Sequence, residues 1–190
     1  MNNNKEKMLR ITVLFLISQV VIIFGLTAQG HSDYVRSVLG TTFLWVVYTF
    51  FEARCRLYMN NYVRGLVVIS ILCDGFFGYY LNLYATSSVF DKILHVFGTY
   101  GLSLFSYVLA VQLLENPVNK LFKFILVVCL GLSIGTFYEI LEFLTDTISH
   151  PALVSQPSLL DTDLDLIANV IGAVFAGIHA SARSFMDQDF

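Results

Sequence analysis

Six apolar segments constrain what this chain can fold into more than any motif does. They cover residues 9–28, 38–52, 65–83, 91–114, 121–146 and 161–180. A helix needs about 20 apolar residues to cross the hydrocarbon core of a bilayer, and helices satisfy their own backbone hydrogen bonds there. Composition agrees, because 56% of the residues are hydrophobic and 13% are charged, against about 25% charged in soluble domains. We therefore predict an all-α, polytopic transmembrane helical bundle, with one helical domain over 9–180 and polar tails at 1–8 and 181–190.

The second segment is the shortest, and the distribution of basic residues supports it. A helix over 38–52 crosses the membrane only if Arg36 and Arg54 extend outward at its two ends. With the N-terminus in the cytoplasm, two cations lie outside, Arg36 and Lys92, and nine lie inside. The nine are Lys5, Lys7, Arg10, Arg54, Arg56, Arg64, Lys120, Lys123 and Arg183. Since cytoplasmic loops are rich in Lys and Arg, this bias predicts six spans with both termini in the cytoplasm.

Several classes of protein are excluded by the remaining composition. The three cysteines, Cys55, Cys73 and Cys129, lie on or beside apolar segments without CxxC spacing, which argues against a disulfide framework or a zinc knuckle. The Phe and Tyr side chains are typical of lipid contact and of an interfacial belt, so no nucleic-acid partner is expected. Membrane lipid is the expected partner.

The same topology concentrates acidic residues near the outer face. Eight of the 14 carboxylates fall there: Asp33, Asp91, Glu139, Glu142, Asp146, Asp161, Asp163 and Asp165. Asp74 instead lies in the middle of the third segment. It is either a functional intramembrane acid or the partner of a group on a neighbouring helix, since charges in that position are expensive.

The end of the fifth segment carries three of these acids on one helix face. Glu139, Glu142 and Asp146 are spaced three and then four residues apart. Glu142 and Asp146 are expected near headgroup water, whereas Glu139 lies about 10 Å of helix rise from Asp146, inside the apolar boundary. Below them, Gly135 and Gly131 form a GxxxG arrangement that lets a neighbouring helix approach closely.

The fourth and sixth segments present matching groups. Asp91 and His95 are one helical turn apart on the fourth. The sixth carries a stripe of Asp161, Asp165 and Asn169, which Gly172 continues. A simpler interpretation also stands: Asp91 and Asp161 are good N-cap residues, and Asp163 is expected to be solvated. Together, however, these stripes predict three packed helices around a polar pocket beneath the outer leaflet.

Three blocks of sequence resemble a known family. They are Asp91-Lys92-Ile93-Leu94-His95, then Tyr138-Glu139-Ile140-Leu141-Glu142-Phe143, then Asp161 to Gly172 with its Asp165 and Asn169. In this order they are similar to the signature blocks of YjdF-like bacterial inner-membrane proteins and, more loosely, to VanZ-like proteins. A VanZ-like tyrosine would stand four residues after His95, where this chain has Thr99. The resemblance covers Phe90 to Gly177 and implies a helical bundle in a bacterial inner membrane, without an established reaction.

Three functions are compatible with these residues. The first is a divalent-cation site, with Mg²⁺, Mn²⁺ or Zn²⁺, that acts on a lipid or a lipid-linked substrate. Its expected ligands are Asp91, His95, Glu139, Glu142 and Asp165, supported by Asp146, Asp161, Asn169 and Lys92. The same groups could instead exchange protons.

The second function is a small proton- or cation-coupled transporter that uses the same acids, with Asp74 as an inner station. The third is a non-catalytic membrane protein whose polar pocket binds a partner or holds the bundle together. The enzyme hypothesis lacks an evident Ser or Cys nucleophile. The transporter hypothesis lacks polar residues on the inner halves of the last three segments.

Overall fold

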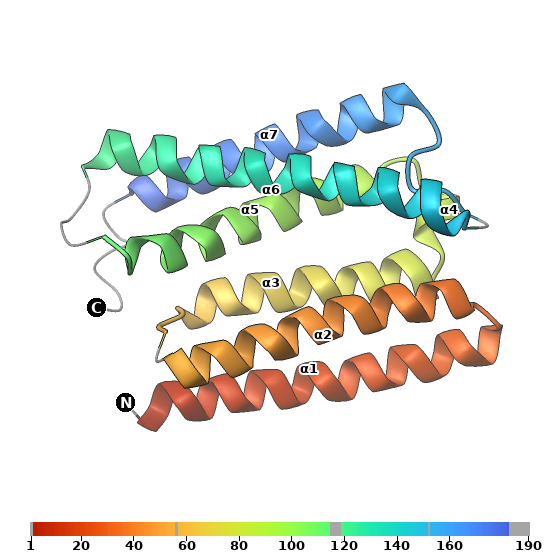
Figure 1. Ribbon diagram of the computed structural model, residues 1–190, viewed down its shortest axis with the longest axis horizontal. Coiled ribbons are helices and arrows are strands. Elements are labelled where there is room, and N and C mark those ends of the chain that lie inside the picture. Colours follow the sequence, from red (N-terminus) through yellow and green to blue (C-terminus); the bar gives the residue numbers. More distant parts are fainter. Residues whose placement is uncertain (1, 56, 115–118, 152, 183–190) are drawn as a thin grey trace. The chain divides into compact units, whose positions relative to one another are not determined.

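A computed structural model describes residues 2–55, 57–114, 119–151 and 153–182, with side chains from residue 5 onward. The chain divides into two compact units, Met1–Thr86 and Ser87–Phe190, and each is described by itself below (Figure 1). The described residues are helical apart from turns and short connections, so the all-α prediction is confirmed. Arg56, residues 115–118 and the tail from Arg183 onward lie outside the described part.

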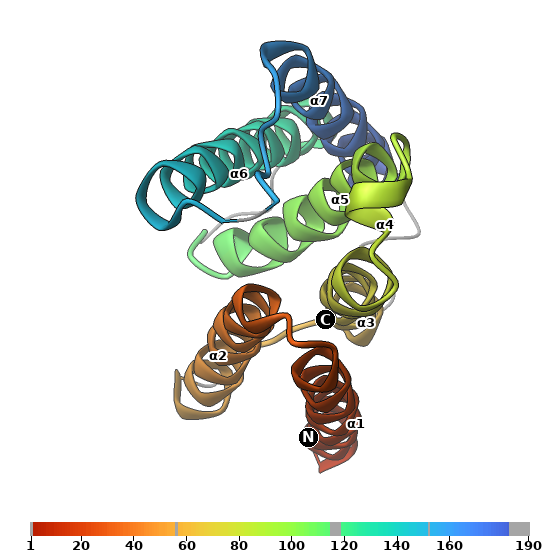
Figure 2. The same ribbon diagram turned by 90° about the vertical axis from the view of Figure 1, so that its right-hand side faces the viewer.

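The first unit is built from three long helices and two short ones. They are α1 Asn2–Gln29, α2 Ser32–Cys55, α3 Asn61–Cys73, the π-helix η1 Asp74–Tyr80 and α4 Leu83–Thr86. Helix α1 packs against both α2 and α3, as Figures 1 and 2 show. Gly30 joins α1 to α2 with a φ of 80°, a conformation that glycine adopts without steric cost. The α1–α2 connection can therefore be very short.

An apolar cluster lies in the interior of this unit, and large apolar side chains also lie on its exterior. Ile22, Leu26 and Val38 form a buried cluster. On the opposite face of α1, Val21 and Phe24 are 65% and 72% exposed. A soluble protein rarely presents such continuous apolar surface, so the outer face of α1 fits a lipid environment.

Helix α2 is longer than the expected 38–52 segment. It has 24 residues, or roughly 36 Å at 1.5 Å per residue, so Arg36 lies within the helix and Arg54 lies in its last turn. The helix thus extends beyond the apolar segment at both ends, and a crossing with these two side chains extended outward stays a prediction.

A buried ion pair joins α2 to α3 and corrects the prediction for Arg64. The predicted apolar segments 38–52 and 65–83 leave Arg64 in the connection between them, but α3 begins at Asn61 and the Arg64 side chain is fully buried. Its two terminal nitrogens donate to the Glu52 carboxylate at 2.6 and 2.7 Å, and one also donates to the Met59 carbonyl at 3.2 Å. The guanidinium binds the carboxylate through two parallel hydrogen bonds. This pairing of opposite charges explains why Arg64 is buried within the unit.

Asp74 also has a local partner. It begins the π-helix η1 and is buried, and the Tyr84 hydroxyl of α4 donates to its Oδ1 at 2.5 Å. A Cβ at Gly78 would overlap the Tyr84 ring, so this glycine makes room for the contact. The hydrogen bond fits the expected pairing with a neighbouring helix, and the further role of Asp74 as an inner station stays a prediction.

The second unit consists of α5 Phe90–Val111, α6 Lys120–Ser149 and α7 Leu159–Ser181, each packed against the other two. Figure 2 shows the three helices around a common axis. The GxxxG prediction is confirmed, because a Cβ at Gly135 would lie 2.7 Å from the Asn169 Cβ and one at Gly131 would overlap Ser103 and Ala173. At Gly172 the overlap is with backbone atoms of Val96. Small residues thus let the three helices touch.

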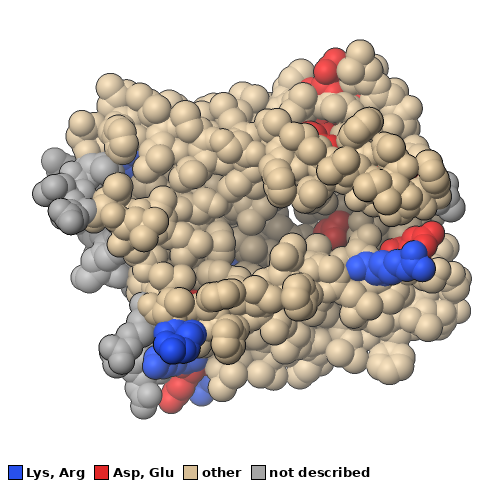
Figure 3. Space-filling view, viewed as in Figure 1, with Lys and Arg blue, Asp and Glu red and all other residues tan. Residues whose placement is uncertain are grey.

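Five helical stretches in the described residues are long and apolar enough to cross a membrane: 5–29, 61–80, 90–111, 120–149 and 159–181. Most of the face that Figure 3 shows is free of charged side chains. Helix α2 is not among the five stretches, so its crossing stays a prediction, as do the single domain over 9–180 and the sidedness. The fourth expected segment ends three residues early, at Val111, and the fifth continues to Ser149.

Candidate functional site

Polar side chains from all three helices of the second unit meet where α5 and α7 begin and α6 ends. Helix α5 contributes Asp91, Lys92 and His95; α6 contributes Glu139 and Glu142; α7 contributes Asp161, Asp165 and Asn169. Four of them are almost inaccessible: His95 is 8%, Glu139 5%, Asn169 2% and Asp165 1% exposed. We refer to these eight residues as the polar cluster. Except for Asp146, the structure therefore brings together the groups that helical spacing singled out, while their role as ligands stays a prediction.

Lys92 is the central cation of one half of the cluster. Its Nζ lies 2.5 Å from Asp161, 2.8 Å from Asp165 and 3.1 Å from Asp91. A lysine ammonium has three N–H donors, and here each can be directed to a different carboxylate. Lys92 thus holds the first turns of α5 and α7 together and compensates part of their negative charge.

The N-cap interpretation of the two outermost acids is wrong. Val89 precedes α5 without a side-chain capping bond. Helix α7 is capped by Ser158, whose Oγ accepts from the Asp161 backbone N–H at 3.2 Å. Asp91 and Asp161 instead lie in the first helical turn, where carboxylates interact favourably with the helix dipole, and their side chains contact Lys92. Asp163 on the same helix is exposed, as expected.

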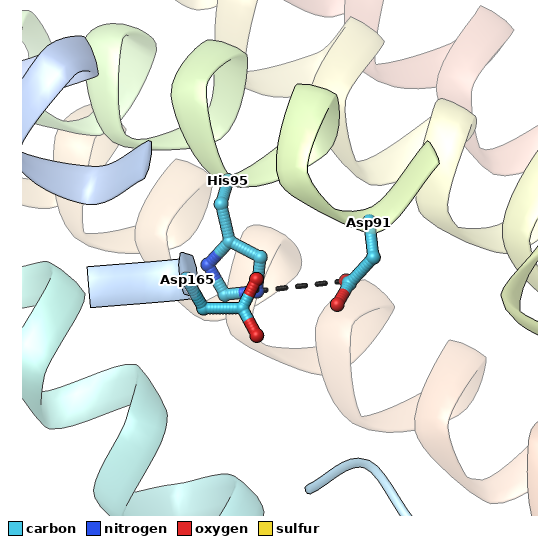
Figure 4. A group of neighbouring side chains, drawn as sticks. All are labelled: Asp91, His95 and Asp165. Atoms are coloured by element: carbon cyan, nitrogen blue, oxygen red, sulfur yellow. Dashed lines mark ion pairs between the residues drawn. The ribbon is translucent and has the colours of Figure 1, made fainter. Parts of the chain in front are cut away.

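His95 lies between the carboxylates of three elements. Its Nε2 is 3.5 Å from Asp91 Oδ1 and 3.7 Å from Asp165 Oδ1, and its Nδ1 is 3.5 Å from Glu139 Oε1. Figure 4 shows the imidazole of α5 and the Asp165 carboxylate of α7 side by side, with Asp91 one turn away. The Tyr138 ring meets the imidazole edge-on at 5.7 Å. His95 therefore links the carboxylates around Lys92 on α5 and α7 to Glu139 on α6.

Glu139 has one oxygen that is hydrogen-bonded and one that is not. Gln156, from the connection between α6 and α7, donates from Nε2 to Glu139 Oε2 at 3.0 Å. Glu139 Oε1 is buried and accepts no hydrogen bond from any described residue. An unpaired buried carboxylate oxygen is costly, so a ligand is expected to complete its coordination.

Asn169 is the member of the cluster that lies furthest along α7 from its first turn. Its Oδ1 accepts a hydrogen bond from Thr99 Oγ1 at 2.5 Å and lies 3.2 Å from His95 Nδ1. Its Nδ2 is buried and has no hydrogen-bond partner among the described residues. Gly135 of α6 leaves the space that the Asn169 side chain fills.

Two groups in the cluster have the spacing of metal ligands, and they share His95. One is Asp91, His95 and Asp165; the other is His95, Glu139 and Glu142. In each group, one candidate ligand atom per residue lies within 4.8 Å of the others. Carboxylate oxygens with one imidazole suit Mg²⁺, Mn²⁺ or Zn²⁺, so the donor set fits a divalent cation.

Asp146 has a different role from the other expected acids of α6. Its two oxygens accept the backbone N–H groups of Ser155 and Gln156 at 2.9 and 2.8 Å. Asp146 therefore fixes the α6–α7 connection and is not part of the polar cluster.

Sequence reasoning missed two features of the site. Gln156 lies in an irregular connection, where no periodicity indicates its direction. Thr99, Ser103 and Tyr107 continue the face of Asp91 and His95 at intervals of four residues, and all three are buried. That spacing was a usable signal, and it shows that polar groups extend along α5 beyond the cluster.

Comparison with known proteins gives one relative and one family. An uncharacterized protein of Thermotoga maritima is 35% identical over 107 residues, which cover 54% of this chain and 53% of the relative. The aligned part thus spans about half the length of that relative. No solved structure matches the chain. A model of the family described as "Predicted membrane protein (DUF2238)" matches residues 9–184, and the chain therefore belongs to this family of membrane proteins.

Proposed function

We propose that this membrane protein holds a divalent cation between His95, Glu139 and Glu142 and uses it on a lipid or lipid-linked substrate. Mg²⁺, Mn²⁺ and Zn²⁺ are the candidate ions. A bound cation would act as a Lewis acid and would attach an anionic phosphate to a pocket that otherwise repels it. We further propose that the chain is a YjdF-like protein of a bacterial inner membrane. Both termini would lie in the cytoplasm, and the polar cluster would lie beneath the outer leaflet.

The observation that carries this proposal is the unpaired oxygen of Glu139. Oε1 is buried, lacks a hydrogen-bond donor and faces His95 Nδ1 at 3.5 Å. A cation bound by Oε1, the imidazole and Glu142 would satisfy this oxygen and compensate the negative charge of α6.

Lys92 is the reason to place the cation at His95, Glu139 and Glu142 rather than at Asp91, His95 and Asp165. Its ammonium already contacts Asp91, Asp161 and Asp165, so a metal among Asp91, His95 and Asp165 would meet a positive charge at close range. Among the described residues, no Lys or Arg forms an ion pair with Glu139 or Glu142. The group of His95, Glu139 and Glu142 is therefore the better cation site.

Elemental analysis of the detergent-purified protein tests the proposal. We expect a stoichiometric divalent metal in the wild type, and its loss in Glu139→Gln and in His95→Ala. Asp163→Asn is the matched control, because Asp163 is an exposed acid on α7, and it should retain the metal. Equal metal content in all four proteins, or no metal after incubation with Mg²⁺, Mn²⁺ and Zn²⁺, would contradict the proposal.

The second candidate is a proton- or cation-coupled transporter, which one observation favours. Below His95, the buried Thr99, Ser103 and Tyr107 continue the same face of α5. Thr99 donates to Asn169, but Ser103 donates to the Thr99 backbone carbonyl at 2.6 Å, so this stripe is partly closed by bonds within the helix. Proton-linked cation flux in proteoliposomes that Glu139→Gln abolishes, without a bound metal, would favour this candidate. A non-catalytic role would leave Glu139→Gln without effect in both assays.

A further inference from the structure

The connection between α6 and α7 turns back toward the polar cluster. Helix α6 ends at Ser149 and is followed by its C-cap residue His150, which has a φ of 46° in the left-handed region. The backbone N–H groups of Ser155 and Gln156 then both donate to Asp146, at 2.9 and 2.8 Å. Because each oxygen of this carboxylate accepts one of two successive amides, the path of the chain at Gln156 is fixed.

This path directs the Gln156 side chain at Glu139. Its Nε2 donates to the Glu139 backbone carbonyl at 2.9 Å and to Glu139 Oε2 at 3.0 Å. A primary amide nitrogen has two N–H donors, and here both serve one residue. The bond to the backbone carbonyl fixes the Gln156 amide on α6, and the bond to Oε2 then orients the Glu139 carboxylate.

The orientation decides which carboxylate oxygen is presented to His95. With Oε2 bound to Gln156, the oxygen at 3.5 Å from His95 Nδ1 is Oε1, which has no other donor. We propose that Gln156 is a positioning residue of the site: it holds the Glu139 carboxylate so that Oε1 faces His95, and Asp146 anchors the segment that carries it. This inference rests on the proposed function in giving Oε1 a cation to bind.

The chemistry of an amide suits this task. Gln156 donates hydrogen bonds without adding positive charge, so Glu139 is oriented while its negative charge stays available for a cation. A lysine at the same place would orient the carboxylate but neutralise it, as Lys92 does for its three partners. Outer hydrogen bonds of this kind are worth 10- to 100-fold in metal affinity in known sites.

Gln156→Met tests the inference, because methionine has similar length and no donor. We expect Mn²⁺ affinity to fall about 10- to 100-fold, and metal-free Glu139 to react several-fold faster with a carbodiimide, as measured by mass spectrometry of the adduct. Asp146→Asn should shift both readouts in the same direction by a smaller factor. Ser155→Ala is the matched control, since it keeps the backbone N–H and should behave as wild type. Melting temperatures confirm that each variant is folded.

The two readouts separate this inference from the proposed function. If wild type binds Mn²⁺, and Gln156→Met binds it equally and reacts at the same rate, the positioning role is overturned and the cation site stands. If wild type binds no Mn²⁺ but Gln156→Met still changes the reactivity of Glu139, the cation site is wrong and the positioning role stands. No binding together with unchanged reactivity would overturn both.

Discussion

Buried charges lie in both units of the molecule, but they are compensated in different ways. In the first unit, Arg64 and Glu52 form a bidentate pair of one cation and one anion. In the second unit, Lys92 compensates three carboxylates, and two more, Glu139 and Glu142, lie near His95 without such a cation. The Arg64–Glu52 pair is balanced in charge and joins α2 to α3. The second set has an excess of negative charge, and that excess is what calls for a ligand.

Removing one partner of the complete pair should have the largest effect. Arg64→Met leaves the Glu52 carboxylate buried without its cation, so we expect the free energy of unfolding to fall by about 3–5 kcal/mol, measured by denaturation in detergent. The double variant Arg64→Met with Glu52→Met should recover most of this loss, because it removes both charges. A single variant as stable as wild type would show that the pair is not a structural element.

Removing a charge from the incomplete cluster should instead affect binding. Glu139→Gln removes a buried carboxylate oxygen that lacks a donor, so stability without metal should stay the same or rise. Mn²⁺ affinity should fall by at least about 100-fold, or roughly 2.7 kcal/mol, since a direct ligand is lost. A variant that is strongly destabilised without metal would erase the contrast between the two units.

Close packing of α5 and α7 is the next requirement of the cluster. Gly172→Ala would place a methyl group against the backbone of Val96, and backbone cannot move aside easily, so we expect a loss of about 1–3 kcal/mol. Gly98→Ala on α5 is the control, because nothing lies within 4 Å of its added Cβ. Thermal unfolding of the two variants should differ accordingly. Equal melting temperatures would mean that the contact of α5 with α7 is looser than described.

Replacing the internal cation should give the smallest effect. Lys92→Met removes the ammonium from Asp91, Asp161 and Asp165, which opens the group of Asp91, His95 and Asp165 to a metal. Mn²⁺ at tenfold its Kd for this group should then stabilise the variant by about 1.4 kcal/mol beyond its effect on wild type. Differential scanning fluorimetry with and without Mn²⁺ measures this. An identical Mn²⁺ response in both proteins would count against Lys92 as the occupant of that group.

Regular spacing explains what could be predicted. Asp91 and His95 share a face of α5, and Asp165 and Asn169 share a face of α7, because groups four residues apart are neighbours on any helix. Glycines at 131 and 135 then indicated which face of α6 meets them. The helical class followed from the length of the apolar segments and the composition, and the meeting of these groups followed from their helical spacing.

Other features depend on the path of irregular chain and could not be predicted in this way. Gln156 reaches Glu139 because Asp146 binds two backbone amides of the connection, and neither contact has a periodic signature. Arg64 reads as a loop cation because its partner Glu52 lies across a connection on another helix. The start of α7 could not be predicted either: the N-cap residue is Ser158, three residues before Asp161, the residue that the sequence suggested.

The most direct test of the account is a Mn²⁺ titration of the detergent-purified protein followed by electron paramagnetic resonance. The account predicts about one bound Mn²⁺ per chain, with a nitrogen coupling from the His95 imidazole that disappears in His95→Ala and binding that is lost in Glu139→Gln. Mn²⁺ that does not bind, or that binds equally when His95 and Glu139 are both replaced, would contradict the cation site.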